Sequence, residues 1–259
     1  MSIKNHFLKT SESQPIPLPD DSPNHAFQET PMATIAEALL TLATSRVICS
    51  ELPGIYTHVR NLMEATGRAD SLTQETLLVN LYASLHTAGS LYSPSERVLL
   101  SKRAGYSCHA GGLSPLIRAE PFITPDSVVV DLGAGNGLQG LLLQCLSPHR
   151  KTLQVELSSE MIRIGRLFQE ALGISADRVE WIHDDLVNVS VEAADIVYLY
   201  RPARTSPDGR ELYRTIARKL ASVPKPLMVF SVADCLGQFL NEQFSLFFTD
   251  GHLTCFSKR

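Results

Sequence analysis

The sequence has few features that would place the protein outside the cytoplasm. Its five cysteines form no Cys-x-x-Cys pair and their number is odd, which argues against a disulfide framework and a zinc-ribbon site. No apolar run approaches the roughly 18–20 residues that span a bilayer, and residues 1–10 lack the continuous apolar core of a signal peptide. We therefore expect a cytoplasmic protein without a membrane partner.

Positive charge is not in excess either. The 23 Lys and Arg residues face 27 Asp and Glu residues, giving a formal net charge of −4, so no overall basic field attracts nucleic acid. The chain is 44% hydrophobic and 19% charged, which is typical of soluble globular proteins. Its 259 residues suffice for one large domain with a smaller companion.

Three segments differ in their pattern. Residues 1–30 contain four closely spaced prolines, which predict an extended, poorly packed tail. Residues 31–104 show apolar residues at helical spacing and no strand pattern, which predicts a helical N-terminal subdomain. Residues 105–259 alternate strand and helix patterns. We expect them to form an α/β domain with a mostly parallel sheet and helices on both faces.

The expected elements can be bounded from the pattern. In the N-terminal segment, helices are expected around residues 32–47, 55–63 and 71–85 and from Ser93 onward. The Asp250-Gly251 pair suits a tight turn between two final antiparallel strands. In the C-terminal segment we expect strands at 128–130, 152–155, 179–182, 196–200, 227–230, 244–248 and 253–256, and helices at 138–146, 160–172 and 209–221.

A glycine-rich loop follows the first of these strands. Asp131 ends the β-branched run, and glycines at 133, 135 and 137 follow it; they let the backbone pass close beneath a ligand before a helix begins. A dinucleotide-binding loop reads Gly-x-Gly-x-x-Gly and would need its third glycine at Leu138. A nicotinamide-dependent oxidoreductase therefore stays open only as an alternative.

The segment Asp131-Leu132-Gly133-Ala134-Gly135-Asn136-Gly137 resembles the first motif of the class I S-adenosylmethionine-dependent methyltransferases. The resemblance covers about residues 105–259 and implies a Rossmann-like, mostly parallel seven-stranded sheet that ends in an antiparallel hairpin. It implies S-adenosylmethionine as the cofactor, and we expect no metal. The cofactor-binding residues expected from it are Asp131, Gly133, Ala134, Gly135, Asn136, Gly137, Glu156, Leu157, Asp184, Asp185 and Leu186.

The resemblance gives these residues distinct roles. Glu156, at the end of the second strand, resembles the acidic residue that accepts hydrogen bonds from both ribose hydroxyls. Asp185, or else Asp184, matches the aspartate that binds the adenine amino group, with Leu157 and Leu186 as apolar neighbours.

The other end of the cofactor carries a sulfonium, an ammonium and a carboxylate but no phosphate. Carboxylates and carbonyls near Asp131 and Gly133 suit its cations, and we expect the loop amides to meet its carboxylate. Three alternatives stay open: Asp131 only caps the next helix, Asp184 and Asp185 only cap a turn, and Trp181 is a core residue or an adenine platform.

The end of the fourth strand bears on the methyl acceptor. Tyr200-Arg201-Pro202 lacks the Asn or Asp before Pro-Pro-aromatic of amino-methylating nucleic-acid enzymes and the aspartate of metal-dependent ones. We therefore expect an N or O acceptor on a small molecule or protein side chain rather than on nucleic acid. Arg201 and Arg204 favour an anionic acceptor, the carboxylate of the cofactor or an ion pair with the Asp184-Asp185 turn.

Four residues are candidates for catalysis: Tyr106, His109, Tyr200 and Arg201. Tyr106 and His109 precede the first strand in a segment that resembles a lid over the cofactor, although a plain linker would show the same pattern. Methyl transfer depends mainly on alignment and exclusion of water, and an amine acceptor must first lose a proton. A non-catalytic S-adenosylmethionine-binding scaffold is the remaining alternative.

Overall fold

The computed structural model of the chain describes residues 31–65, 71–88, 92–107 and 112–259. The expectations for the proline-rich segment 1–30 and for His109 lie outside the described residues.

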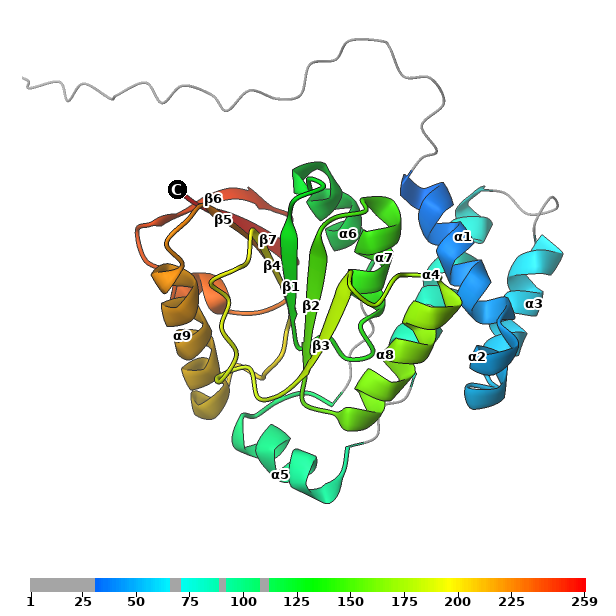
Figure 1. Cartoon of the computed structure of the whole chain (residues 1–259), viewed down its shortest axis with the longest axis horizontal. Helices are drawn as coiled ribbons and strands as arrows, with labels where there is room; N and C mark the ends of the chain where they lie inside the picture. Colours follow the sequence, from blue (N-terminus) through cyan, green and yellow to red (C-terminus); the bar gives the residue numbers. More distant parts are fainter. Residues whose placement is uncertain (1–30, 66–70, 89–91, 108–111) are drawn as a thin grey trace, which may run out of the picture.

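A seven-stranded sheet forms the centre of the molecule, with the order β3-β2-β1-β4-β5-β7-β6 (Figure 1). The first five strands are parallel, and β7 is antiparallel to both β5 and β6. The mostly parallel sheet with a closing hairpin is therefore confirmed. The strands are β1 (Val128–Leu132), β2 (Lys151–Glu156), β3 (Val179–His183), β4 (Ile196–Tyr200), β5 (Leu227–Val232), β6 (Phe244–Thr249) and β7 (Leu253–Lys258).

Helices cover both faces of the sheet, which is why its central strands are apolar on both sides. Along β1, Val129 joins one buried cluster with α7 (Leu138–Leu146) and α8 (Ser159–Ala171). Val130 joins the opposite cluster with α9 (Pro207–Ser222). Residues 184–195 connect β3 to β4 by turns without a helix.

The N-terminal helices pack outside α7 and α8 (Figure 1). They are α1 (Pro31–Thr44), α2 (Arg46–Glu51), α3 (Ile55–Ala65) and α4 (Ser71–His86). Leu39 of α1 and Leu81 of α4 lie in the same buried cluster as Leu142 of α7. The apolar spacing predicted α1, α3 and α4, but it merged α2 with α1, because the break at Ser45 interrupts the helix for one residue only.

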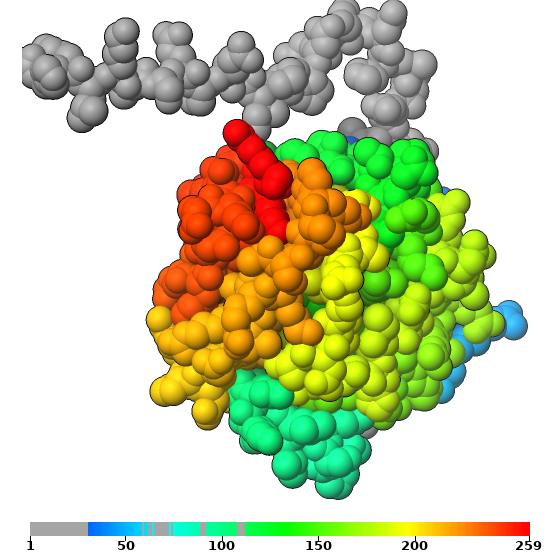
Figure 2. Space-filling model, turned by 60° about the vertical axis from the view of Figure 1, so that its left-hand side comes forward, coloured from blue at the N-terminus to red at the C-terminus, as the bar shows by residue number. Residues whose placement is uncertain are grey.

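Helix α5 (Pro94–Lys102) lies apart from the other N-terminal helices. The predicted start is confirmed: the Ser93 side chain accepts from the Glu96 amide, and the Glu96 side chain accepts from the Ser93 amide. Figure 2 shows α5 as a blue-green projection at the lower end of the molecule. The short helices α6 (Ser114–Ala119), η1 (Glu120–Phe122) and η2 (Leu236–Gln238) were not expected.

In the glycine loop, Gly137 packs tightly against the Trp181 ring. Gly137 has a φ of +67°, and a Cβ at this position would collide with the ring of Trp181. The Trp181 indole also donates to Gln169 Oε1 over 2.8 Å. Trp181 thus packs beneath the loop as a core residue, and it does not face the candidate site as an adenine platform would.

Candidate active site

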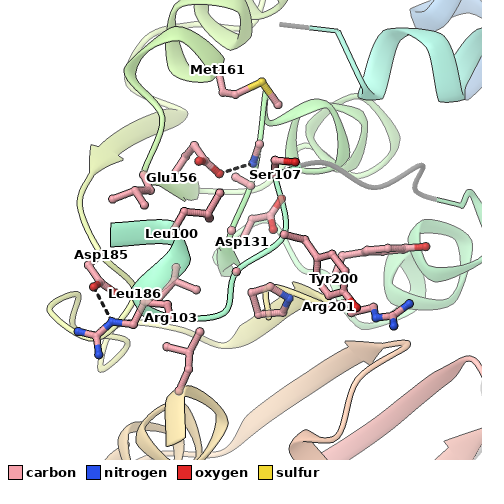
Figure 3. Close-up of a pocket in the computed structure, with 18 of the residues that line it drawn as sticks. Leu100, Arg103, Ser107, Asp131, Glu156, Met161, Asp185, Leu186, Tyr200 and Arg201 are labelled. Carbon is pink, nitrogen blue, oxygen red and sulfur yellow. Dashed lines mark hydrogen bonds and ion pairs between the residues drawn. The ribbon is translucent and has the colours of Figure 1, made fainter. Parts of the chain in front are cut away.

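A cavity lies at the carboxyl ends of β1, β2 and β4, with part of its wall from α5 (Figure 3). In Figure 3, Asp131 lies between Glu156 on one side and Tyr200 and Arg201 on the other. The structure brings most of the expected residues together here. Those that line the cavity are Tyr106, Asp131, Gly133, Ala134, Gly135, Glu156, Leu157, Asp184, Asp185, Leu186, Tyr200 and Arg201.

The Glu156 carboxylate is held in one orientation at the end of β2. It is 4% exposed. Its Oε2 accepts from the Gly135 amide and its Oε1 from the Ser158 amide, both over 2.8 Å, and the Tyr92 hydroxyl lies 3.4 Å from Oε1. Burial raises the pKa of Glu156, and these hydrogen bonds act in the opposite direction. The result is a buried acceptor group aimed into the cavity.

Asp131 lies beside it at the end of β1. Its side chain is 3% exposed, and burial together with the nearby charge of Glu156 raises its pKa to about 8. The N-cap of α7 is Gly137, so the alternative that Asp131 caps this helix is wrong. A buried carboxyl group in this position is suited to a cationic ligand, which would favour its charged form.

The amides of the glycine loop are used within the protein. Gly133 and Ala134 both donate to the Val155 carbonyl, over 3.0 and 2.9 Å, and Gly137 donates to the Ala134 carbonyl over 2.8 Å. The Gly135 amide binds Glu156. The expectation that loop amides meet the carboxylate of the cofactor is therefore wrong for these residues, because the tight turn against β2 consumes their donors. The same amides are not available to a pyrophosphate.

Asn136 and Gly137 do not line the cavity. The Asn136 side chain is fully buried and donates to the carbonyls of Leu85 and Ala88, over 2.7 and 3.2 Å. It ties the loop to the end of α4, so its role here is structural.

Helix α5 closes the side of the cavity near β3. Arg103, just after α5, donates from Nε to Asp185 Oδ2 over 2.8 Å (Figure 3). Asp184 accepts from the Asn188 side chain over 2.7 Å. Leu100 of α5 joins the expected apolar residues of this wall. The ion pair of Asp185 that the structure records thus comes from Arg103, a residue that the sequence pattern did not single out.

The opposite side of the cavity is basic and aromatic. The guanidinium carbons of Arg201 and Arg204 lie 4.8 and 4.9 Å from the centre of the Tyr106 ring. Arg201 has a φ of +39°, an uncommon conformation for a residue other than glycine. Burial raises the pKa of the Tyr200 phenol, while the charge of Arg201 acts in the opposite direction. Tyr200 therefore stays protonated at neutral pH and is a donor rather than a base.

The cavity also contains residues that the sequence did not indicate. His86, Tyr92, Gln139, Met161 and Tyr198 line it. Two of their atoms, Gln139 Oε1 and the Tyr198 hydroxyl oxygen, are buried without a hydrogen-bond partner among the described residues. The sequence pattern does not indicate His86 and Tyr92, because α4 and the segment before α5 reach the cavity only through tertiary packing. The described residues hold no group of three or more potential metal ligands and no helix long and apolar enough to cross a membrane.

No protein-family model matches the chain, and no curated protein matches it. Among solved structures, an RNA methyltransferase from Salinibacter ruber in complex with S-adenosyl-L-homocysteine is 20% identical, with 57% of this chain and 91% of that chain covered and a TM-score of 0.44. TrmN from Thermus thermophilus is 17% identical over 56% of this chain and 48% of its own, with a TM-score of 0.47.

A third match is an S-adenosylmethionine-dependent methyltransferase from Geobacter sulfurreducens in complex with S-adenosyl-L-homocysteine. It is 23% identical over 54% of this chain and 55% of its own, with a TM-score of 0.40. These matches are too distant to assign a function. The sheet order and its antiparallel hairpin give this chain the fold of the class I S-adenosylmethionine-dependent methyltransferases.

Proposed function

We propose that the protein is an S-adenosylmethionine-dependent methyltransferase. The observation that carries the proposal is the buried pair of carboxyl groups at the ends of neighbouring strands. Glu156 is fixed by two backbone amides and faces the cavity, as a receptor for a ribose diol requires. Asp131, at the centre of the cavity wall, is a buried carboxyl group whose charged form a cationic ligand would favour.

The residues of the cavity fit this cofactor from end to end. Glu156 would hold the ribose, and Leu100, Leu157 and Leu186 would pack around the adenine. Arg103 already binds Asp185, so we assign Asp185 to fixing this wall and, through its remaining acceptor capacity, to the adenine amino group. When bound, the cofactor supplies an electrophilic methyl group on a sulfonium.

The chain itself would align the methyl acceptor with the cofactor and keep water out of the cavity. Helix α5 and the residues after it line one side of the cavity and would exclude water from a bound cofactor, and Tyr200 and Arg201 form the wall across from Glu156 (Figure 3). The Tyr200 hydroxyl would donate a hydrogen bond to the substrate that accepts the methyl group. An ammonium acceptor would give its proton to His86, which lines the cavity beside Tyr200 at a ring distance of 6.5 Å.

The dinucleotide alternative loses support from the loop geometry. A pyrophosphate binds to free amides of the glycine loop and of the helix start that follows it, but the loop amides of Gly133, Ala134, Gly135 and Gly137 are bonded within the protein. Asp131 beneath the loop would also repel a phosphate once it is ionised. A non-catalytic scaffold would bind the same ligand and yield no methylated product.

The test is to replace Glu156 by Ala and to measure the binding of S-adenosylhomocysteine and NAD by calorimetry. We expect the wild-type protein to bind S-adenosylhomocysteine and not NAD, and Glu156→Ala to weaken that binding at least tenfold, about 1.4 kcal/mol. Glu180→Ala is a matched control, because Glu180 is exposed on β3 and pairs with Lys151 over 3.2 Å. Equal affinity of Glu156→Ala and the wild type would contradict the ribose assignment.

For the acceptor, we propose an N or O atom on a small molecule or protein side chain that carries an anionic group. Arg201 lines the cavity, and Arg204 lies with it around Tyr106. The formal net charge of −4 provides no general attraction for a polyanion. Methylation of carboxylate-bearing compounds but not of their amides would support this class, and methylation of RNA alone would contradict it.

A further inference from the structure

Two buried polar atoms of the cavity have no partner among the described residues. They are the hydroxyl oxygen of Tyr198 and Oε1 of Gln139, on side chains that are 1% and 2% exposed. A buried polar group without a hydrogen bond lowers stability. Both residues line the cavity, so the cavity is the place where a partner for these atoms would bind.

These atoms lie next to Asp131. Tyr198 on β4 is the register partner of Asp131 on β1, and both side chains are on the face covered by α7. Gln139 is in the first turn of α7, and its Nε2 donates to the Tyr82 hydroxyl and to the Gly112 carbonyl. Because its NH₂ group is already used, the free atom of the Gln139 side chain is an acceptor. The cluster therefore combines a carboxyl group, an acceptor and a hydroxyl donor.

The amino-acid end of the cofactor needs this combination. Its ammonium requires acceptors and its carboxylate requires a donor. The loop amides of Gly133, Ala134, Gly135 and Gly137 do not meet that carboxylate, because they are bonded within the protein.

We propose that Asp131 and Gln139 Oε1 bind the ammonium of S-adenosylmethionine and that the Tyr198 hydroxyl donates to its carboxylate. This inference rests on the proposed function. It makes Tyr198 and Gln139 residues that select the full amino-acid end of the ligand over shortened nucleosides.

The experiment compares three ligands by calorimetry on the full chain. S-Adenosylhomocysteine has both charged groups, S-adenosyl-3-thiopropylamine lacks the carboxylate, and 5′-methylthioadenosine lacks both. Tyr198→Phe removes only the hydroxyl. We expect it to weaken S-adenosylhomocysteine about tenfold, the loss expected for one hydrogen bond to a charged group, and to leave the other two ligands within about twofold of the wild type.

A second variant addresses the ammonium. We expect Gln139→Leu to weaken both amine-bearing ligands and to leave 5′-methylthioadenosine unchanged, with circular dichroism confirming the fold. Tyr213→Phe is the control, because the Tyr213 hydroxyl donates to the Ala203 carbonyl over 2.8 Å and belongs to the buried cluster on the opposite face of the sheet. It should leave the ratios of the three affinities unchanged.

Each outcome decides a separate question. Equal losses for all three ligands in Tyr198→Phe, or no loss for any, would overturn the inference while leaving the proposed function intact. A carboxylate-dependent loss in Arg201→Gln together with none in Tyr198→Phe would place the carboxylate at Arg201 and also overturn it. Failure of the wild-type protein to bind any of the ligands would instead contradict the proposed function.

Discussion

At the scale of the residue, two buried carboxyl groups share one cavity but are held differently. Glu156 accepts two backbone hydrogen bonds, whereas the structure records none to Asp131 from the described residues. Burial without compensating hydrogen bonds favours the neutral form of Asp131. Asp131 thus holds a proton at the place where we propose that a cation binds.

This proton makes the stability of the protein depend on pH. The pKa of Asp131 is raised from 3.8 to about 8 in the folded state, so the folded state binds more protons than the unfolded state between these values, and stability falls as the pH rises through them. We expect the free energy of unfolding to fall less between pH 5.5 and 8 in Asp131→Asn than in the wild type. Urea unfolding at both pH values measures the difference.

The control for this prediction is Asp126→Asn, an exposed carboxylate, which should keep the pH dependence of the wild type. Glu156, whose pKa is also raised, is present in all three proteins. An Asp131→Asn variant with the same pH dependence as the wild type would show that Asp131 is ionised in the folded state.

The sequence predicts that two residues meet where both lie near the carboxyl ends of adjacent parallel strands. Asp131 and Glu156 end adjacent parallel strands, so their convergence follows from the strand pattern. Tyr198 was visible only as one residue of an apolar strand, and Gln139 as one residue of a helix. Their meeting depends on the packing of α4 and α7 against the sheet, which no local pattern encodes.

At the scale of the element, α5 acts as a cover held by its first turn and its last. Glu96 Oε1 accepts from the Ser159 amide over 2.9 Å and lies 3.3 Å from His183 Nε2, which joins α5 to α8 and β3. At the other end Arg103 binds Asp185. Burial acts to raise the pKa of Glu96, but hydrogen bonds from Ser159 and Ser93 outweigh it and lower the pKa to about 2.

We expect Glu96→Gln to loosen α5. An amide cannot accept from Ser93 and Ser159 at once in the way that the carboxylate does. Hydrogen exchange of residues 92–103 should become faster, and the affinity for S-adenosylhomocysteine should fall by about three- to tenfold, which is less than the full loss of one charge-assisted hydrogen bond because Glu96 acts through the position of α5. Because the pKa of Glu96 is lowered, its contribution is complete above about pH 4.5 and is lost only as the pH falls through 2.

Val98→Ala is the matched control, since Val98 is an exposed residue of the same helix. It should change neither exchange near Ser93 nor ligand affinity. Unchanged exchange in Glu96→Gln would mean that the helix is held by its other contacts.

The elements themselves were largely predictable. The Ser93-Pro94 helix start and the Asp250-Gly251 turn are local signals, and the structure has the predicted helix and hairpin. The sequence pattern does not predict α6, because this helix has only six residues, too few for a helical periodicity to be recognised. The covering position of α5 was not predictable, because it is set by contacts between residues far apart in the sequence.

At the scale of the whole molecule, the N-terminal helices share their core with the sheet. Residues of α1, α4 and α7 and the side chains on one face of β1, β4 and β5 belong to one buried cluster. The sequence pattern predicted a helical subdomain over residues 31–104. It did not predict the shared core, because helical periodicity shows that one face of a helix is apolar but not what that face packs against. The shared core favours a single folding unit.

We therefore expect one cooperative unfolding transition. In urea, the fluorescence of Trp181, the sole tryptophan, reports the α7–α8 side of the sheet, and far-ultraviolet circular dichroism reports all helices. The two curves should coincide. Separate midpoints, with helical signal lost before the fluorescence changes, would show that the N-terminal helices unfold on their own.

The Tyr92 hydroxyl beside Glu156 has a kinetic consequence. If a ribose binds the Glu156 carboxylate, as we propose, it has to displace the Tyr92 hydroxyl. Association would then include a unimolecular movement of Tyr92 as well as the encounter with the ligand. In rapid mixing, the observed rate would then reach a plateau as the ligand concentration rises, and removal of that hydroxyl would lift the plateau.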